Sequence, residues 1–280
     1  MSQILIVGAN SALARDAMPI LSQRHKIITA GRSGCDIICD ITKDIVIPEG
    51  TDVVINFAAG FAGTNDDEFL NTFKTNTLGI LAICAAANQA NVGYVVNISS
   101  VFAELIPEHP QYTIYALSKK QADELASYFC LLRNLPLLTL RPSQIYGDTM
   151  AYAKHQPFLY EIIDRAAHGR DITVFGEHDP QRNYIHSADL ATIISLAVDA
   201  RLEGTYSCLY PENIGIAEIG KIAEGIFGKG STIAFDPTKP NTPDTVFSIN
   251  TELFEALGYY PRISMETGIT QIKTYMEAHV

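Results

Sequence analysis

Short apolar runs alternate with longer amphipathic segments through the first half of the chain. The apolar runs occupy residues 3–7, 26–30, 36–39, 52–59, 94–98 and 136–141, and amphipathic spacing occurs at about 13–21, 66–90 and 112–133. A run that is apolar at nearly every position is typical of a strand covered on both faces. Strands that alternate with helices in this way predict a parallel sheet joined by right-handed crossovers.

The alternation changes character after Pro142. Residues 143–157 are expected to form a loop, and Pro-rich connections lie around Pro237–Pro243. We expect helices at about 158–168, 187–200, 216–227, 250–257 and 266–277, and strands at 171–175 and near 205–208. The helix at 187–200 and the strand near 205–208 are expected to return to the main sheet.

The composition describes a folded, acidic protein. Its 280 residues are 47% hydrophobic, enough for one large domain or a domain with a smaller lobe. The formal charge of -11 argues against nucleic acid or an anionic membrane as the main partner. No apolar run is long enough to span a membrane, and no charged leader precedes the first strand, so we expect a cytoplasmic protein. Five scattered cysteines, with no second pair or nearby histidine, predict free thiols and no metal site.

The first strand ends in a tight turn, Gly8-Ala-Asn-Ser-Ala-Leu-Ala14, that leads into a helix. Strand, turn and helix in this order form the first unit of a dinucleotide-binding sheet, in which helix N-terminal amides hold the phosphates. Ser11 and Ala14 replace the usual second and third glycines, but both are small enough for the backbone to approach a pyrophosphate. A plain packing turn is the alternative. The residues assigned to the cofactor here are Gly8, Asn10, Ser11, Ala12 and Leu13.

Arg32 and Ser33 follow the second strand, where an NAD-binding chain usually carries an acidic residue. A guanidinium suits a 2′-phosphate by its charge and its fork of donors, so this pair favours NADPH over NAD. A solvated loop arginine is the alternative. Ala58 and Ala59, at the carboxyl end of a later strand, leave room for a flat ligand.

The stretch from Tyr94 to Lys119 carries the candidate chemistry. It contains a buried strand, Ser99 and Ser100 at the end of that strand, and Tyr115 and Lys119 four apart on a helix. Residues four apart share a helix face, and the carboxyl end of a strand is where such sheets bind ligands. Tyr115 would be an acid, Lys119 the cation that lowers its pKa, and Ser100 a donor to a carbonyl. The alternative is an amphipathic helix with a half-buried aromatic and a solvated lysine.

Nine short pieces of sequence form an ordered set along almost the whole chain. They are Gly8-x-x-Ser11-x-x-Ala14, Asp40-Ile41, Asn56-Phe-Ala-Ala59, Asn76-Thr-Leu-Gly79, Ser99-Ser100, Tyr115-Ala-Leu-Ser-Lys119, Leu140-Arg-Pro-Ser-Gln-Ile-Tyr-Gly147, Arg182-Asn-Tyr-Ile-His-Ser-Ala-Asp189 and Leu257-Gly-Tyr-Tyr-Pro261. In this order they resemble the extended short-chain dehydrogenases/reductases that modify nucleotide-linked sugars, of the NAD-dependent epimerase/dehydratase type. Each piece is weak by itself, and their common order makes the resemblance specific.

The resemblance implies further cofactor contacts. Asp40 and Ile41 would touch the adenine, and Asn76 would belong to the cofactor site. Tyr115 and Lys119 would also meet the cofactor, Lys119 through a hydrogen bond to the nicotinamide ribose.

The resemblance also implies substrate contacts and shows where this chain departs from the family. Ser100, Gln144 and Arg182 would contact the substrate, with Arg182 at its diphosphate and Gln144 where many members have Asn. Val101-Phe102 replaces the Asp-Glu pair that sugar 4,6-dehydratases use, so dehydration is not expected. A second diphosphate-binding arginine has no counterpart, and Lys239 is the candidate substitute.

Together these features predict an α/β fold, a Rossmann-type doubly wound parallel sheet with helices on both faces and a smaller C-terminal α+β substrate lobe. The dinucleotide-binding domain would comprise residues 1–147 plus about 182–208, and the lobe about 148–181 plus 209–280. The resemblance adds a homodimer through the helices at about 66–90 and 112–133.

The sequence therefore predicts an NADPH-dependent reductase of a nucleotide-linked 4-keto-6-deoxy sugar, with hydride delivered to the C4 ketone and Tyr115 as general acid. A nucleotide-sugar 4-epimerase that retains NAD would keep the same catalytic residues and is the alternative enzyme. A non-catalytic NADP(H) sensor is the alternative from another class. Such relatives typically lose the tyrosine or the lysine, and this chain keeps both.

Overall fold

The computed structural model describes residues 1–61 and 63–279, and its backbone packs as two compact units. Unit 1 comprises Met1–Pro142, Ala191–Cys208 and Glu252–Gly258. Unit 2 comprises Ser143–Leu190, Leu209–Thr251 and the chain from Tyr259 onward. Each unit is therefore assembled from segments that are far apart in the sequence.

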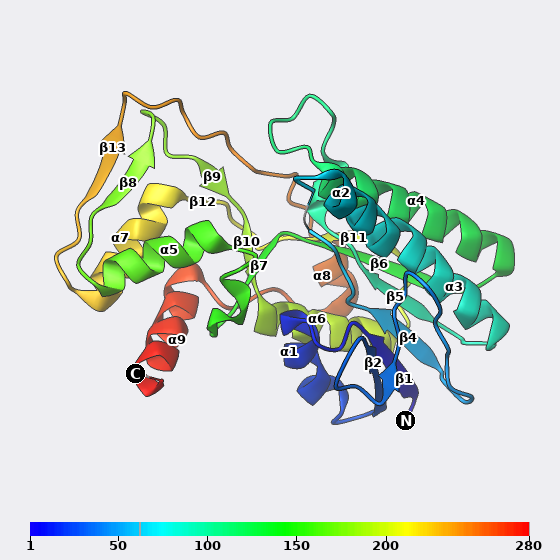
Figure 1. The fold of residues 1–280 in the computed structure, drawn as a ribbon. Helices are drawn as coiled ribbons and strands as arrows, with labels where there is room; N and C mark the ends of the chain where they lie inside the picture. The colour runs from blue at the N-terminus through cyan, green and yellow to red at the C-terminus, as the bar shows by residue number, and fades with distance from the viewer. Residues whose placement is uncertain (62, 280) are drawn as a thin grey trace. The chain divides into compact units, whose positions relative to one another are not determined.

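Unit 1 is built on a seven-stranded parallel sheet with the strand order β11-β6-β5-β4-β1-β2-β3 (Figure 1). The strands are β1 (Gln3–Val7), β2 (Lys26–Gly31), β3 (Ile37–Ile38), β4 (Val53–Asn56), β5 (Val95–Ile98), β6 (Leu137–Pro142) and β11 (Gly204–Cys208). The order reverses between β1 and β4, and open α/β sheets bind ligands at such a switch point. The doubly wound parallel sheet is confirmed, and so is the return of the strand near 205–208.

Helices cover both faces of this sheet. The helices are α1 (Ala12–Leu21), α2 (Asp66–Phe73), α3 (Gly79–Gln89), α4 (Ile114–Arg133), α6 (Ser187–Ala200) and α8 (Glu252–Leu257). Figure 1 shows α2, α3 and α4 along one face and α1 and α6 along the other. Right-handed crossovers place them so, because the chain winds in opposite directions from the switch point. Among the described residues, no helix is both long and apolar enough to cross a bilayer.

One buried hydrophobic cluster of unit 1 lies between the sheet and helices α3 and α4. Leu5, Val54 and Val95 of the sheet belong to one buried cluster with Ile83 of α3 and Ala126 of α4. The small residues of α4 let its backbone lie close to the strands, so the side chains at its N-terminal end lie near the carboxyl end of β5.

The predicted helical region at 66–90 is interrupted by a π-helical turn, η1 (Lys74–Leu78), between α2 and α3. This turn buries Asn76 and Thr77, and the Thr77 hydroxyl donates to the Ser118 carbonyl of α4 over 2.9 Å. Single π turns often occur at functional sites. Here the turn directs two polar side chains toward α4.

Unit 2 contains four helical elements and three small two-stranded sheets among its described residues. They are β7 (Gln144–Tyr146), η3 (Met150–Tyr152), α5 (Pro157–Ala167), β8 (Ile172–Phe175), β9 (Gln181–Arg182), β10 (Tyr184–His186), β12 (Ile214–Gly215), α7 (Ile216–Phe227), β13 (Ile233–Asp236) and α9 (Met265–Ala278). The expected loop at 143–157 is wrong in part, because it contains β7 and η3. These strands have two to four residues and pair with distant segments, as β8 does with β13.

Candidate functional site

Ser100, Tyr115 and Lys119 lie together at the carboxyl end of β5. The Ser100 hydroxyl caps the short helix η2 (Val101–Glu104) by accepting from the Phe102 amide over 3.2 Å, and it also hydrogen-bonds Tyr115. Lys119 is buried, and its Nζ donates to the Ile98 carbonyl over 2.9 Å. The same Nζ lies 5.9 Å from the centre of the Tyr115 ring. The structure thus brings the three predicted catalytic residues together.

Burial governs the protonation of this cluster. Burial raises the pKa of Tyr115 to about 12, and the hydrogen bond with Ser100 opposes it. Burial also lowers the pKa of Lys119 to about 8, and the Asp123 carboxylate opposes that change. The sequence predicted that Lys119 lowers the pKa of Tyr115, whereas the pKa of Tyr115 in the structure is raised. The main reason is burial of the phenol, and the Lys119 amine donates its hydrogen bond to the Ile98 carbonyl.

Two aromatic rings flank Tyr115, and the sequence predicted neither of these contacts. Phe61, after β4, stacks on the Tyr115 ring with centroids 5.0 Å apart and planes at 21°. Phe102 meets the same ring edge-on, with centroids 6.3 Å apart. Phe61 is 51% exposed. The only sequence signal was an apolar residue directly after the small Ala58-Ala59-Gly60 strand end.

The turn after β1 fits a dinucleotide pyrophosphate. Gly8 has φ +77°, and a Cβ there would lie 2.6 Å from the Ala58 amide nitrogen, so only glycine fits. Ser11 caps α1 by accepting from the Ala14 amide over 3.3 Å. The amides of Ala12 and Leu13 have no acceptor within the described residues. Helix N-terminal amides that have no acceptor, next to a glycine without a side chain, attract phosphate oxygens.

The predicted adenosine-side residues surround the loop after β2. Asn10 joins that loop to the first turn through a 2.6 Å hydrogen bond from its Nδ2 to the Ser33 carbonyl. Arg32 is exposed and makes no hydrogen bond or ion pair within the described chain. Hydrogen bonds from the Thr42 side chain and amide lower the pKa of Asp40. Ile41 is buried and belongs to the core cluster.

Asn76 uses its side chain within the protein. Its Oδ1 accepts from the Gly60 amide over 2.7 Å, and its Nδ2 donates to the Gly60 carbonyl and the Ser118 hydroxyl, each over 2.9 Å. Both N–H groups of the amide are therefore occupied. Asn76 holds Gly60, which directly follows Ala58 and Ala59. It would therefore contribute to a dinucleotide site by positioning this segment.

The two predicted substrate contacts outside unit 1 lie in unit 2. The Gln144 side-chain nitrogen Nε2 donates to Gln156 Oε1 over 3.0 Å, whereas the buried Gln144 Oε1 has no partner among the described residues. Arg182 is buried, and its Nη1 donates to the carbonyls of Gln181 and Pro243 over 2.9 and 2.7 Å. Burial lowers the pKa of Arg182.

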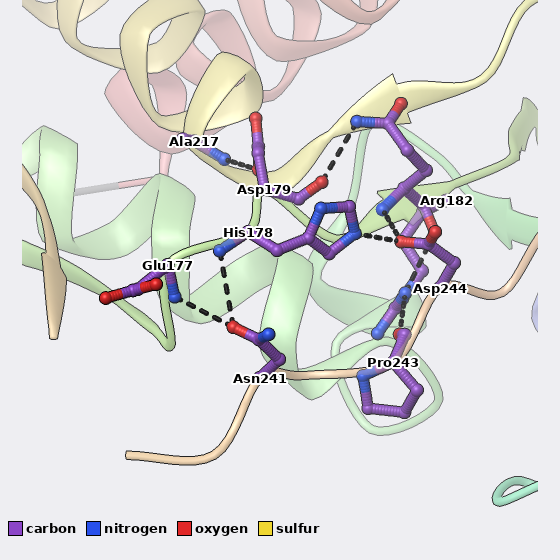
Figure 2. A network of polar contacts seen from close by, with 9 residues as sticks. Glu177, His178, Asp179, Arg182, Ala217, Asn241, Pro243 and Asp244 are labelled. Carbon is purple, nitrogen blue, oxygen red and sulfur yellow. Dashed lines mark hydrogen bonds and ion pairs between the residues drawn. The ribbon is translucent and has the colours of Figure 1, made fainter. Parts of the chain in front are cut away.

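The surroundings of Arg182 form a polar network that the sequence did not reveal (Figure 2). The Asp244 carboxylate accepts from His178 Nε2 over 2.6 Å and from the Gln181 amide over 2.8 Å. Asn241 accepts from the Glu177 amide over 2.8 Å. These contacts join residues more than sixty positions apart, so no local pattern could predict them.

Residues 4–208 match the family described as NAD dependent epimerase/dehydratase. Among curated proteins, the low-salt glycan biosynthesis protein Agl12 of Haloferax volcanii is 25% identical over 272 residues, covering 90% of this chain and 82% of that protein. The Arabidopsis thaliana trifunctional UDP-glucose 4,6-dehydratase/UDP-4-keto-6-deoxy-D-glucose 3,5-epimerase/UDP-4-keto-L-rhamnose-reductase RHM2 is 23% identical over 258 residues. That match covers 82% of this chain and 36% of the longer plant protein.

Solved structures share the fold at low sequence identity. UDP-glucose 4-epimerase from Thermotoga maritima, solved with UDP-glucose, superposes with a TM-score of 0.78 at 17% identity and 99% coverage of both chains. RMD from Pseudomonas aeruginosa, complexed with NADPH, gives a TM-score of 0.79 at 17% identity and complete coverage of both chains. The fold of this chain is therefore one that these proteins share.

Proposed function

Since this chain belongs to the NAD-dependent epimerase/dehydratase family, and is an enzyme of that kind, we propose that it is an NADPH-dependent reductase of a nucleotide-linked 4-keto-6-deoxy sugar. The observation that carries the proposal is the Ser100, Tyr115 and Lys119 cluster at the end of β5. It lies on the same sheet edge as the Gly8 turn, because all strands of the sheet are parallel.

The chemistry follows from the protonation of these groups. A bound nicotinamide dinucleotide would supply the hydride for the C4 ketone. Burial keeps the Tyr115 phenol protonated, so its Oη can donate a proton to the oxygen on which negative charge develops. The Ser100 hydroxyl donates a hydrogen bond to the same oxygen. The Lys119 ammonium then favours the phenolate that remains.

The preference for NADPH rests on Arg32. Its guanidinium is exposed and makes no hydrogen bond or ion pair among the described residues. The pKa of Asp40 is lowered mainly by hydrogen bonds from the Thr42 hydroxyl and amide, over 2.8 and 3.0 Å, and to a lesser extent by the charge of Arg32. Arg32 is therefore available to a 2′-phosphate. Structural relatives have been solved with NAD, as MoeE5, and with NADPH, as RMD from Pseudomonas aeruginosa, so both cofactors occur on this fold.

Four observations support the proposed substrate class. RHM2 carries a UDP-4-keto-L-rhamnose-reductase activity in its name. The buried Gln144 Oε1 is an acceptor suited to a sugar hydroxyl, and the charge of Arg182 suits a diphosphate. Val101 is fully buried and Phe102 packs on Tyr115. Both side chains are hydrocarbons, so neither supplies the carboxyl group that dehydration needs.

The test is a turnover assay. Purified protein is expected to oxidise NADPH, followed at 340 nm, with a nucleotide-linked 4-keto-6-deoxy sugar, and Tyr115→Phe is expected to bind NADPH but lose turnover. Wild-type rates in Tyr115→Phe would refute the assignment of the acid. Protein that is purified with bound NAD and interconverts C4 epimers would support the 4-epimerase instead. Tight NADPH binding without turnover on any keto sugar would support a sensor.

We also propose a homodimer through α2 and α4. These helices pack together in unit 1 and expose several large apolar side chains, namely Phe69, Leu70, Leu125, Tyr128, Leu131 and Leu132. Apolar side chains gathered on neighbouring helices are typical of an interaction surface. Light scattering after size exclusion is expected to give twice the 30.6 kDa chain mass, and Leu131→Glu is expected to give monomer.

A further inference from the structure

Asp123 is a buried carboxylate that the mechanism above does not use. It is 5% exposed and lies on α4 one turn beyond Lys119. Arg141 Nε of β6 donates to its Oδ2 over 2.8 Å, and Asn97 Nδ2 of β5 lies 3.5 Å from its Oδ1. A carboxylate is rarely buried to this extent without a specific role, because desolvation of the charge is costly.

The spacing places Asp123 on the same face of α4 as Tyr115 and Lys119. Tyr115, Lys119 and Asp123 follow each other at intervals of four residues, so they share one helix face. The only hydrogen bond that the described residues give the Lys119 amine is to the neutral Ile98 carbonyl, which does not balance its charge. Asp123 is the carboxylate that acts on Lys119.

Other groups around Lys119 do not replace this carboxylate. On α4 the titratable groups that face it are Tyr115 and Asp123, and on β6 the charged group is Arg141. Glu104 of η2 lies 3.6 Å from Arg141 and accepts from the Ser207 hydroxyl over 2.6 Å, so it balances the arginine. The side chains that β5 and η1 present, Asn97, Ser99, Ser100, Asn76 and Thr77, do not titrate near neutral pH.

We propose that Asp123 is a positioning residue that keeps Lys119 in its ammonium form, and that Arg141 holds Asp123 in place. The inference rests on the proposed function, in which this ammonium stabilises the Tyr115 phenolate. Burial by itself drives a lysine to lose its proton and a carboxylate to gain one. A carboxylate one turn away opposes the first change, and the guanidinium bound to that carboxylate opposes the second.

The test compares Asp123→Asn with wild type in two measurements. In the first, the pH profile of kcat for NADPH oxidation is recorded. The alkaline limb, on which Lys119 loses its proton, is expected to move down by about one pH unit or more, because removing a nearby opposite charge changes a pKa by this amount. At pH 8, where about half of Lys119 is protonated in wild type, a shift of one pH unit gives a roughly fivefold loss of kcat with little change in KM.

The second measurement titrates Lys119 directly in the free protein. Lysine labelled with ¹³C at Cε is followed by NMR, and the Lys119 signal is assigned by its absence in Lys119→Met. It is expected to titrate at lower pH in Asp123→Asn than in wild type. Asp123→Glu, which restores the charge, is expected to recover most of the difference. Glu124→Gln is the matched control, because Glu124 is the next residue but lies exposed.

The outcomes separate the two proposals. If Lys119 titrates at the same pH in Asp123→Asn as in wild type, Asp123 has only a structural role and the inference is wrong, while an inactive Tyr115→Phe would still support the reductase. If Tyr115→Phe turns over normally, the proposed reductase mechanism fails whatever Asp123 does, and the NMR titration still tests the effect of Asp123 on Lys119. Should Asp123→Asn not fold, Asp123→Ser is the second neutral variant, and the same NMR titration decides.

Discussion

The most direct test of the dinucleotide turn is Gly8→Ala. At Gly8 the backbone has φ +77°, and an added Cβ would meet the Ala58 nitrogen at 2.6 Å, the Ala58 Cα at 2.8 Å and the Phe57 carbonyl carbon at 2.9 Å. All three contacts are backbone atoms, so no side chain can rotate away. The ends of β1 and β4 would have to separate.

Gly34 offers a matched control for the conformational cost. It has φ +60°, and nothing lies within 4 Å of a Cβ added there. Both substitutions place a side chain in the left-handed region, which costs about 1–2 kcal/mol. Only Gly8→Ala adds overpacking, which costs about 1–3 kcal/mol more. We therefore expect losses of about 1–2 kcal/mol for Gly34→Ala and about 2–5 kcal/mol for Gly8→Ala.

Urea unfolding followed by circular dichroism gives these free energies, and calorimetric titration with NADPH gives the effect on binding. Gly8→Ala is expected to weaken NADPH at least about tenfold, since widening the turn moves the helix amides away from the phosphates. Gly34→Ala is expected to bind NADPH normally. Equal losses of stability in the two variants would refute the close contact with Ala58. Normal NADPH affinity in Gly8→Ala would refute the assignment of the turn.

Three further predictions concern other parts of unit 1. Arg32→Ala is expected to weaken NADPH about tenfold while leaving NADH unchanged, because a charge-assisted contact to phosphate is lost; titration with both cofactors checks this. Phe61→Ala is expected to cost about 0.5–1.5 kcal/mol of unfolding free energy more than Phe175→Ala, because Phe61 stacks on Tyr115 and the two phenylalanines are almost equally exposed, at 51% and 50%. If the free energies of unfolding of the two variants in urea differ by less than about 0.5 kcal/mol, the ring stacking of Phe61 on Tyr115 is not stabilising. For Lys119, whose pKa burial lowers from 10.5 to about 8, the folded state has released a proton that the unfolded chain still binds. Between pH 8 and 10.5, stability of wild type relative to Lys119→Met should therefore rise with pH, by up to about 3 kcal/mol, and a flat difference would contradict the burial effect.

The sequence determined the strands and the catalytic spacing well because both depend on local periodicity. A strand covered by helices on both faces must be apolar throughout, so β1, β4, β5 and β6 were visible as continuous runs. The positions of Tyr115 and Lys119 on one helix face follow from helix geometry, and that of Ser100 follows from the end of a strand. In unit 2 the strand expected at 171–175 is present as β8, whereas the other brief strands were missed because two to four residues carry too little pattern.

Tertiary structure alone decided which groups the catalytic residues meet. Asp123 is bound by an arginine 18 positions away, and Phe61 comes from a different strand end to stack on Tyr115. Burial also reversed the expected effect on the Tyr115 phenol, raising its pKa to about 12. Composition and spacing specify which side chains a chain carries and which face of an element they share. The partners and the loss of water around a side chain depend on all the segments that fold against it, and these are remote in sequence.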